Sequence, residues 1–319
     1  MSSTEWSIGG MEISSRALLA PMAGFGDVAF RRLCREYGAG LTTTEMVSVN
    51  GLKYGSVKTG ELLKRAAVER PCAVQLFGSD PETFRFVAAN CECLKDFEIV
   101  DINMGCPMPK VTKQGAGSAL LADAVKASEI VRACIEGFKR PVTVKMRLGI
   151  SSADGAEKFA AAMQEAGAAA IAVHGRTARQ MYSGTADWTA IARVKRALSV
   201  PVIGNGDVSD KEDFKRRLIG SGADAVMIGR GALARPQVFS DILGLPSGGT
   251  VAAALRHVDY MTEYYPDAYA AKLFRKYAVH YLKGKPRSKE IKLALVKAES
   301  VSQVRELLRA FAETEKEEV

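Results

Sequence analysis

The runs PVTVKMR (141–147), AIAVHGR (170–176), PVIGNGD (201–207) and AVMIGRG (225–231) decide the fold. Similar β-branched apolar runs precede them at 17–24, 40–47, 72–77 and 99–105, and segments with helical apolar spacing separate most of the eight. Continuous apolar strands that alternate with helices are typical of a parallel sheet buried on both faces. Eight such units within about 230 residues predict an α/β fold, a (β/α)8 TIM barrel rather than an open doubly wound sheet.

The joints between helices and strands support this prediction. Gly38-Ala39, Gly167-Ala168 and Gly222-Ala223 each stand where a helix should end, and glycine is the residue expected there. The second unit departs from the pattern, because GLKYGSVKTGELLKRAA (51–67) has no clear helical spacing.

Composition excludes several classes of protein. The 319 residues are 47% hydrophobic and 25% charged, near the globular average, which argues against long disorder. We find no apolar run near the roughly 18 residues that a membrane helix needs, and MSSTEWSIGG does not resemble a secretory signal. Six cysteines are too few for a disulfide scaffold. We therefore expect a cytoplasmic protein with no membrane partner and no obligatory protein partner.

Positive charge gathers in one segment. Residues 270–297 hold nine Lys or Arg and one acid, and this difference equals the whole net charge of +8. A neutral body with one basic segment suggests a polyanion as partner, nucleic acid first. A lysine-rich, solvated helix face is an equally good interpretation of the charge alone.

The pattern changes after residue 235. LGLPSGGT (243–250) is typical of a linker, and the remaining sequence has helical spacing throughout. Between Tyr269 and Lys283, apolar and basic side chains fall on opposite halves of a helix. Ser300 and Gln303 form a capping box for a last helix through Phe311. We predict a barrel domain over residues 1–245 and a small helical domain over 246–319.

In a TIM barrel the functional groups lie at the carboxyl ends of the strands. This rule selects Pro21, Met22, Ala23, Gln75, Asn103, Cys106, Lys145, Arg147, His174, Arg176, Asn205, Gly206, Asp207, Gly229 and Arg230. Glycine-rich loops after the seventh and eighth strands, together with an arginine, favour a phosphate site over simple tight turns.

A flavin fits the remaining polar side chains. Lys145, or a protonated His174, would stabilise an anionic reduced flavin, and the amide of Gln75 can pair with the ring edge. Lys145 stands in an otherwise apolar strand, and a buried lysine needs a partner or a function.

Cys106 differs from the other cysteines. Cys34, Cys91, Cys93 and Cys134 fall on predicted helices and Cys72 begins a strand, so all five are interpreted as core residues, and no metal site is expected. Cys106 lies at a strand end, on a loop that continues as PMPKVTKQGAG. An ordinary thiol is mostly protonated at neutral pH, so Cys106 could act as a proton donor, while a thiolate nucleophile remains open.

The motifs APMAG, QLFGSDP, DINMGCP, KVTKQGAGSALL, VTVKMRLG, VHGRT, IGNGD and MIGRG resemble, in order and spacing, the tRNA-dihydrouridine synthases. The bacterial B-type, NifR-like branch is the most similar, and the resemblance covers nearly the whole chain. FRKYAVHYLKG (274–284) is similar to an element of the family's tRNA-binding domain, with Tyr277 in place of the usual histidine.

The resemblance implies an FMN enzyme that reduces the C5–C6 bond of particular tRNA uridines to 5,6-dihydrouridine, with NADPH as electron donor. Hydride would pass from FMN N5 to C6, and Cys106 would give a proton to C5. It also implies the cofactor-binding residues Pro21, Met22, Ala23, Gln75, Lys145, His174, Asn205, Gly206, Asp207, Gly229 and Arg230. Contacts with the tRNA are expected from Asn103, Arg176, Arg275, Lys276, Lys283, Lys285 and Arg287.

Two other functions remain possible from the sequence. A small-molecule flavin reductase, of the dihydroorotate dehydrogenase or ene-reductase kind, would share the flavin site but would not need the basic segment. An RNA-binding protein that has lost catalysis would not need Cys106, Lys145 and His174 together.

Overall fold

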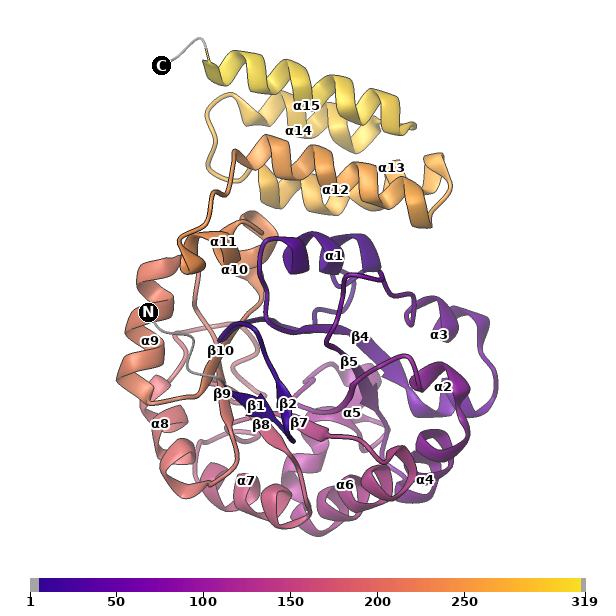
Figure 1. The fold of residues 1–319 in the computed structure, drawn as a ribbon, viewed down its shortest axis with the longest axis vertical. Coiled ribbons are helices and arrows are strands. Elements are labelled where there is room, and N and C mark those ends of the chain that lie inside the picture. The colour runs from indigo at the N-terminus through magenta and orange to yellow at the C-terminus, as the bar shows by residue number, and fades with distance from the viewer. Residues whose placement is uncertain (1–5, 317–319) are drawn as a thin grey trace.

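All eight apolar runs form strands of one parallel sheet in the computed structural model, which describes residues 6–316. These strands are β3 (Ala17–Leu19), β4 (Thr42–Ser48), β5 (Cys72–Phe77), β6 (Ile99–Met104), β7 (Val142–Arg147), β8 (Ala170–His174), β9 (Val202–Asn205) and β10 (Ala225–Ile228). They pair in the order β3-β10-β9-β8-β7-β6-β5-β4. Hydrogen bonds from Leu19 N to Leu41 O and from Gly40 N to Ala17 O, both 2.9 Å, nearly close the sheet. The predicted TIM barrel is confirmed (Figure 1).

Helices surround the barrel (Figure 1). They are α1 (Val28–Glu36), α2 (Val49–Lys53), α3 (Val57–Glu61), α4 (Pro81–Asn90), α5 (Pro109–Thr112), α6 (Ala124–Phe138), α7 (Ala156–Glu165), α8 (Trp188–Ala197), α9 (Lys211–Ser221), α10 (Arg230–Ala234) and α11 (Val238–Leu243), with 3-10 turns η1 (Glu92–Leu94) and η2 (Gly117–Ala122). The irregular second unit contains only the short helices α2 and α3. Gly38, Gly167 and Gly222 have φ of 101°, 103° and 67°, as their position at helix ends predicts.

The inside of the barrel is apolar at its amino-terminal end. Ala73, Ile99 and Ala170 belong to one buried cluster, which Trp6 and Ile8 join from the hairpin of β1 (Ser7–Ile8) and β2 (Met11–Glu12). This hairpin lies across the barrel in Figure 1. Because alternate side chains of a strand face the same way, the next inward positions of these strands reach the carboxyl end.

The chain ends in the helices α12 (Thr250–Tyr264), α13 (Asp267–Tyr281), α14 (Ser288–Lys297) and α15 (Val301–Lys316), stacked beside α1 (Figure 1). At the start of α15, Ser300 Oγ accepts from Gln303 N at 3.3 Å, but Gln303 Oε1 accepts from Glu299 N, one residue earlier than the predicted box requires. The helix also continues beyond Phe311. Among the described residues, none of the helices has the length and apolar character needed to cross a membrane.

Candidate active site

A line of hydrogen bonds connects the polar layer of the barrel to Cys106. Thr143 Oγ1 and Gln75 Nε2 each donate to the carboxylate of Asp101 at 2.6 Å. Gln75 Oε1 accepts from Asn103 Nδ2 at 2.8 Å. Asn103 Oδ1 then accepts from Cys106 N at 2.9 Å. Gln75 and Asn103 are predicted site residues, and they thus fix the backbone of a third predicted site residue, Cys106.

The loop after β6 folds tightly against Cys106. Ser118 N donates to Cys106 O at 2.9 Å, and a Cβ on Gly117 would lie 2.7 Å from that oxygen, so only glycine allows this approach. Burial raises the pKa of the Cys106 thiol and outweighs the opposing effects of the Met108 N–H, Arg147 and Lys145. A raised pKa keeps the sulfur protonated at neutral pH, which favours the proton donor over the thiolate nucleophile.

Lys145 and His174 differ in charge although they stand near the carboxyl ends of neighbouring strands. Lys145 Nζ donates to Asn205 Oδ1 at 3.1 Å, and Asn205 Nδ2 donates to Met227 O at 2.7 Å. Burial and the neighbouring Arg147 lower the pKa of Lys145 to about 8. Burial, with Lys145 and several arginines, lowers the pKa of His174 to about 2. His174 is therefore neutral at physiological pH, and Lys145 is the member of this pair that carries a positive charge.

The loops after β8, β9 and β10 meet at a carboxylate. Asp207 accepts from Arg176 Nη2 at 2.8 Å, from Ala186 N at 2.7 Å and from Arg230 Nη2 at 3.3 Å. Burial raises the pKa of Asp207, but these partners outweigh burial and lower it. Arg176 is buried and also donates to Gly184 O at 2.7 Å. Arg176, which was predicted to contact substrate, thus forms an ion pair with Asp207, and so does Arg230; both Asp207 and Arg230 were predicted to hold phosphate.

The first strand supplies the other side of the mouth. Pro21, Met22 and Ala23 lie in the loop between β3 and α1, half-buried or exposed. Met22 Sδ lies 3.6 Å from the position that a Cβ on Gly229 would occupy. Gly206 has a φ of 130°, and a Cβ there would lie 3.3 Å from His174 Cδ2. The loop of the first strand therefore lies against that of the eighth, and the loop of the seventh strand lies against the end of the sixth.

Two site residues, Asp101 and Tyr182, were not selected from the sequence, and a third, Arg147, was selected without a role. Asp101 orients Gln75, as described above. Arg147, noted only as a strand-end residue, donates through Nε to Gly105 O and through Nη1 to Met181 O, at 2.9 and 2.8 Å. Tyr182 is 60% exposed and lies under the guanidinium of Arg230, 4.8 Å from the ring centroid. The two-residue period could have found Asp101, which faces the same way as Asn103, whereas Tyr182 stands on an irregular loop.

The residues predicted to contact tRNA occupy different settings. Arg275 Nη2 donates to Ala298 O at 2.8 Å, within the C-terminal helices. Lys276 Nζ donates to Gly24 O of the barrel. Tyr277 is fully buried and donates to Asp27 Oδ2 at 2.5 Å, so the residue that departs from the family pattern holds α13 against the barrel. Lys283, Lys285 and Arg287 follow α13, and Lys283 is exposed.

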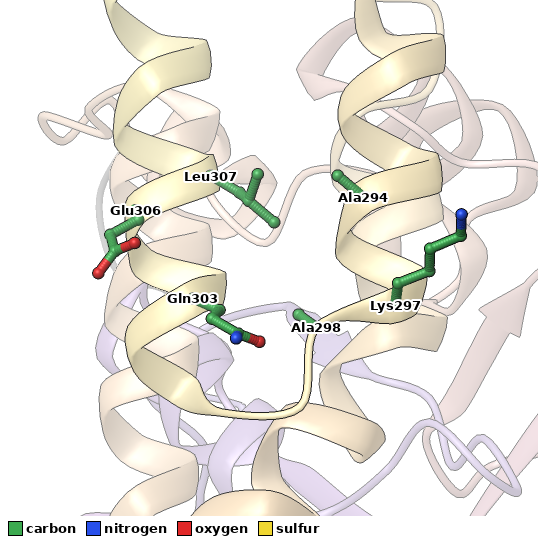
Figure 2. Close-up of a pocket in the computed structure, with 6 residues that line it drawn as sticks. All are labelled: Ala294, Lys297, Ala298, Gln303, Glu306 and Leu307. Atoms are coloured by element: carbon green, nitrogen blue, oxygen red, sulfur yellow. The ribbon is translucent and has the colours of Figure 1, made fainter.

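A groove between α14 and α15 lies on the far side of α12 and α13 from the barrel (Figures 1 and 2). Leu307 and Ala294 point toward each other across it, while Glu306 points outward. Its lining is small and mainly apolar, and the strand ends do not reach it. The convergent polar groups of the barrel mouth therefore mark the candidate active site.

A family model and related sequences match most of this chain. The family model described as Dihydrouridine synthase (Dus) matches residues 18–316. A probable tRNA-dihydrouridine synthase of Rickettsia conorii is 37% identical over 303 residues, covering 90% of each chain. The tRNA-dihydrouridine synthase B of Vibrio parahaemolyticus is 36% identical over 296 residues, covering 89% of this chain and 92% of its own.

Solved structures of lower identity share the fold. Morphinone reductase superposes with a TM-score of 0.53 at 16% identity, covering 77% of this chain and 90% of its own. 2-Naphthoyl-CoA reductase gives a TM-score of 0.58 at 12% identity, covering 76% of this chain and 52% of its own. Since the family match and the closely related sequences each extend over most of its length, this chain belongs to the tRNA-dihydrouridine synthase (Dus) family of enzymes.

Proposed function

We propose that this enzyme reduces the C5–C6 double bond of specific uridines in tRNA to 5,6-dihydrouridine, with bound FMN and with NADPH as electron donor. The observation that carries the proposal is the hydrogen-bonded line from Thr143 to the backbone of Cys106, whose thiol has a raised pKa and lies at a cationic barrel mouth. The relatives' names support the reaction, and family membership supports the cytoplasm, where tRNA is modified, as its location.

The donor set fits an anionic flavin cofactor. Lys145, Arg147 and Arg230 converge on the mouth, and the nearby carboxylate, Asp207, is neutralised by two arginines. Lys145, His174 and Gln75 would hold the ring, with Pro21, Met22 and Ala23 beside it, and Asn205, Gly206, Asp207, Gly229 and Arg230 would hold the ribityl phosphate. When bound, FMN supplies the hydride that adds to uracil C6.

The chain itself supplies orientation and a proton. Cys106 Sγ gives its proton to C5, since a raised pKa keeps the thiol protonated until the base arrives. Asn103 Nδ2 donates to Gln75 Oε1 and, over 3.9 Å, to Met46 Sδ, while Asn103 Oδ1 accepts from the Cys106 loop. A hydrogen bond from Asn103 to the base would therefore replace the weak bond to the Met46 sulfur. A target uracil must leave its stack to enter the mouth, while residues 246–319 bind the tRNA elsewhere.

The test is an anaerobic absorption experiment. The purified protein should show a flavin spectrum that NADPH bleaches and unmodified tRNA restores. Cys106→Ala should leave bleaching by NADPH unchanged and slow the recovery with tRNA by about 10²–10⁴-fold, the usual contribution of a general acid. Cys93→Ala serves as the control and should recover at the normal rate, because Cys93 is exposed on η1 and not a core residue as its sequence position suggested.

Two results would contradict the proposal. Recovery of Cys106→Ala at the rate of the unaltered protein would remove the proton-donor role. Bleaching that tRNA cannot reverse, but that small enones or pyrimidines can, would instead support the small-molecule reductase.

A further inference from the structure

The helix α13, one of the four C-terminal helices, contacts the loop between β3 and α1. This loop forms one wall of the candidate active site. Lys276 Nζ donates to Gly24 O, and on the other side of the same residue Gly24 N donates to Glu45 Oε2 at 2.5 Å. Both backbone polar groups of Gly24 are thus held by charged side chains, one from α13 and one from β4. Gly24 has a φ of 80°, a conformation that favours glycine.

Glu45 owes its position to an irregularity in β4. The pairing of β4 with β5 shifts between Thr43 and Met46, so Thr44 and Glu45 form a bulge. A bulge redirects the side chains of its strand, and here it turns Glu45 toward the loop rather than along the barrel wall. A Cβ on Gly26 would lie 3.0 Å from Glu45 Cγ, which shows how closely the loop wraps this side chain.

Aromatic contacts surround the same bridge. Phe25 packs edge-on against Tyr277 and against His280, with centroids 5.5 and 5.1 Å apart. Lys276 Nζ lies 5.4 Å from the Phe25 ring centroid. Lys276 is only partly exposed, so its ammonium faces these groups rather than the open surface. The loop is therefore clamped by α13, and the helices proposed to bind tRNA are continuous with the wall proposed to hold the flavin.

Resting on the proposed function, we propose that Lys276 is a positioning residue, which holds the β3–α1 loop in its reactive conformation rather than gripping tRNA phosphates. Its ammonium holds Gly24 O and interacts electrostatically with the Glu45 carboxylate, so removing it releases one side of the clamp. The loop then loses its fixed distance to the reacting atoms, a change that costs turnover more than it costs tRNA binding.

The experiment compares Lys276→Met, which keeps the length of the side chain, with Lys276→Arg, which restores the charge. Lys272→Met is the matched control, because Lys272 is an exposed lysine one turn earlier on α13. Hydrogen–deuterium exchange of residues 21–27 should be about tenfold faster in Lys276→Met and near normal in the other two. Turnover at saturating tRNA should fall about tenfold in Lys276→Met alone, while its tRNA dissociation constant matches that of Lys272→Met.

The outcomes separate this proposal from the proposed function. Unchanged exchange in Lys276→Met, or a loss confined to tRNA affinity and equal to that of Lys272→Met, would overturn the positioning role. Failure of the unaltered protein to form dihydrouridine would overturn the proposed function, while the exchange measurement would still decide whether Lys276 holds the loop. Recovery of both exchange and turnover by Lys276→Arg supports the proposal.

Discussion

Two basic residues of the mouth, Lys145 and His174, are kept in opposite charge states by their surroundings. Both are buried, and burial disfavours the charged form of each. The imidazole starts from a pKa near neutrality and loses its charge, whereas the ammonium starts much higher and keeps its charge up to about pH 8. The site therefore has one titrating cation in the physiological range and one neutral ring.

This difference predicts how FMN affinity depends on pH. Lys145 is charged below about pH 8 and becomes neutral above it, so an anionic ligand should bind best below pH 8. The dissociation constant for FMN should rise about tenfold or more toward pH 9.5, since a charge-assisted hydrogen bond contributes roughly 1.5–3 kcal/mol. Fluorescence titration of the apoprotein between pH 6.5 and 9.5 measures this.

Lys145→Met should bind FMN weakly at every pH, and its dissociation constant should show no inflection near pH 8. Cys106→Ala should keep the inflection, because the thiol pKa is raised above its ordinary value and the thiol titrates later. A flat profile in the unaltered protein would show that Lys145 does not contribute its charge to FMN binding.

At the scale of elements, α1 and the C-terminal helices are joined through one buried carboxylate. Asp27 caps α1 by accepting from Ala29 N at 3.1 Å, and it also accepts from Tyr277 on α13. His257 Nε2 on α12 lies 3.9 Å from its other oxygen. Burial raises the pKa of Asp27, but His257, Tyr277 and Lys276 outweigh burial and lower it to about 2. One side chain therefore serves a helix cap and a contact between two parts of the chain.

This contact should make stability depend on pH in a defined window. A carboxyl with a lowered pKa stabilises the fold above its unfolded value of 3.8, and the contribution is lost as the pH falls toward about 2. The difference in unfolding free energy between the unaltered protein and Asp27→Asn should therefore shrink by about 2 kcal/mol between pH 5 and pH 2. Urea unfolding at several pH values measures it.

Tyr277→Phe should lower the unfolding free energy at pH 7 by about 1–3 kcal/mol, because it leaves Oδ2 of the buried Asp27 carboxylate without its tyrosine donor. The control for Asp27→Asn is Asp187→Asn, since Asp187 caps α8 by accepting a hydrogen bond from Ala190 N, as Asp27 caps α1. If Asp27→Asn and Asp187→Asn lose stability equally at every pH, Asp27 acts only as a helix cap.

At the scale of the whole molecule, the excess positive charge lies in one segment of the chain. Outside residues 270–297 the chain as a whole balances its acids and bases, while that segment carries the entire excess of +8. Part of the segment is committed to structure, through Arg275 on Ala298 and Lys276 on Gly24. The remaining charge after α13 is the portion that we propose to bind tRNA.

Replacing Lys283, Lys285 and Arg287 together by glutamine should weaken tRNA binding and flatten its salt dependence. Each lost phosphate contact should reduce the slope of log K against log salt by about 0.7–0.9. Filter binding between 50 and 300 mM salt measures this slope. The control replaces Lys139, Lys158 and Lys215, exposed lysines around the barrel, and should leave the slope unchanged. Equal slopes for the two triple variants would identify the segment as a solvated helix face.

The sequence alone determined the barrel and the location of the site. Strands buried on both faces must be apolar along their length, and inward-facing side chains near their carboxyl ends line the mouth, so the sequence is enough to select Gln75, Asn103, Lys145, His174 and Asn205. The C-terminal glycines of the helices were predictable because their backbone conformation disfavours other residues.

The tertiary structure decided which of these residues touch. The line from Thr143 to Cys106, the capture of Asp207 by Arg176 and Arg230, and the seat of Lys276 on Gly24 all join segments far apart in the chain. Local spacing places a side chain on a face, but its partner and its pKa depend on what the fold brings within a few ångströms and how far it excludes water. For this reason Lys276 looked like part of a basic face in the sequence and proved to be a bridge to the barrel.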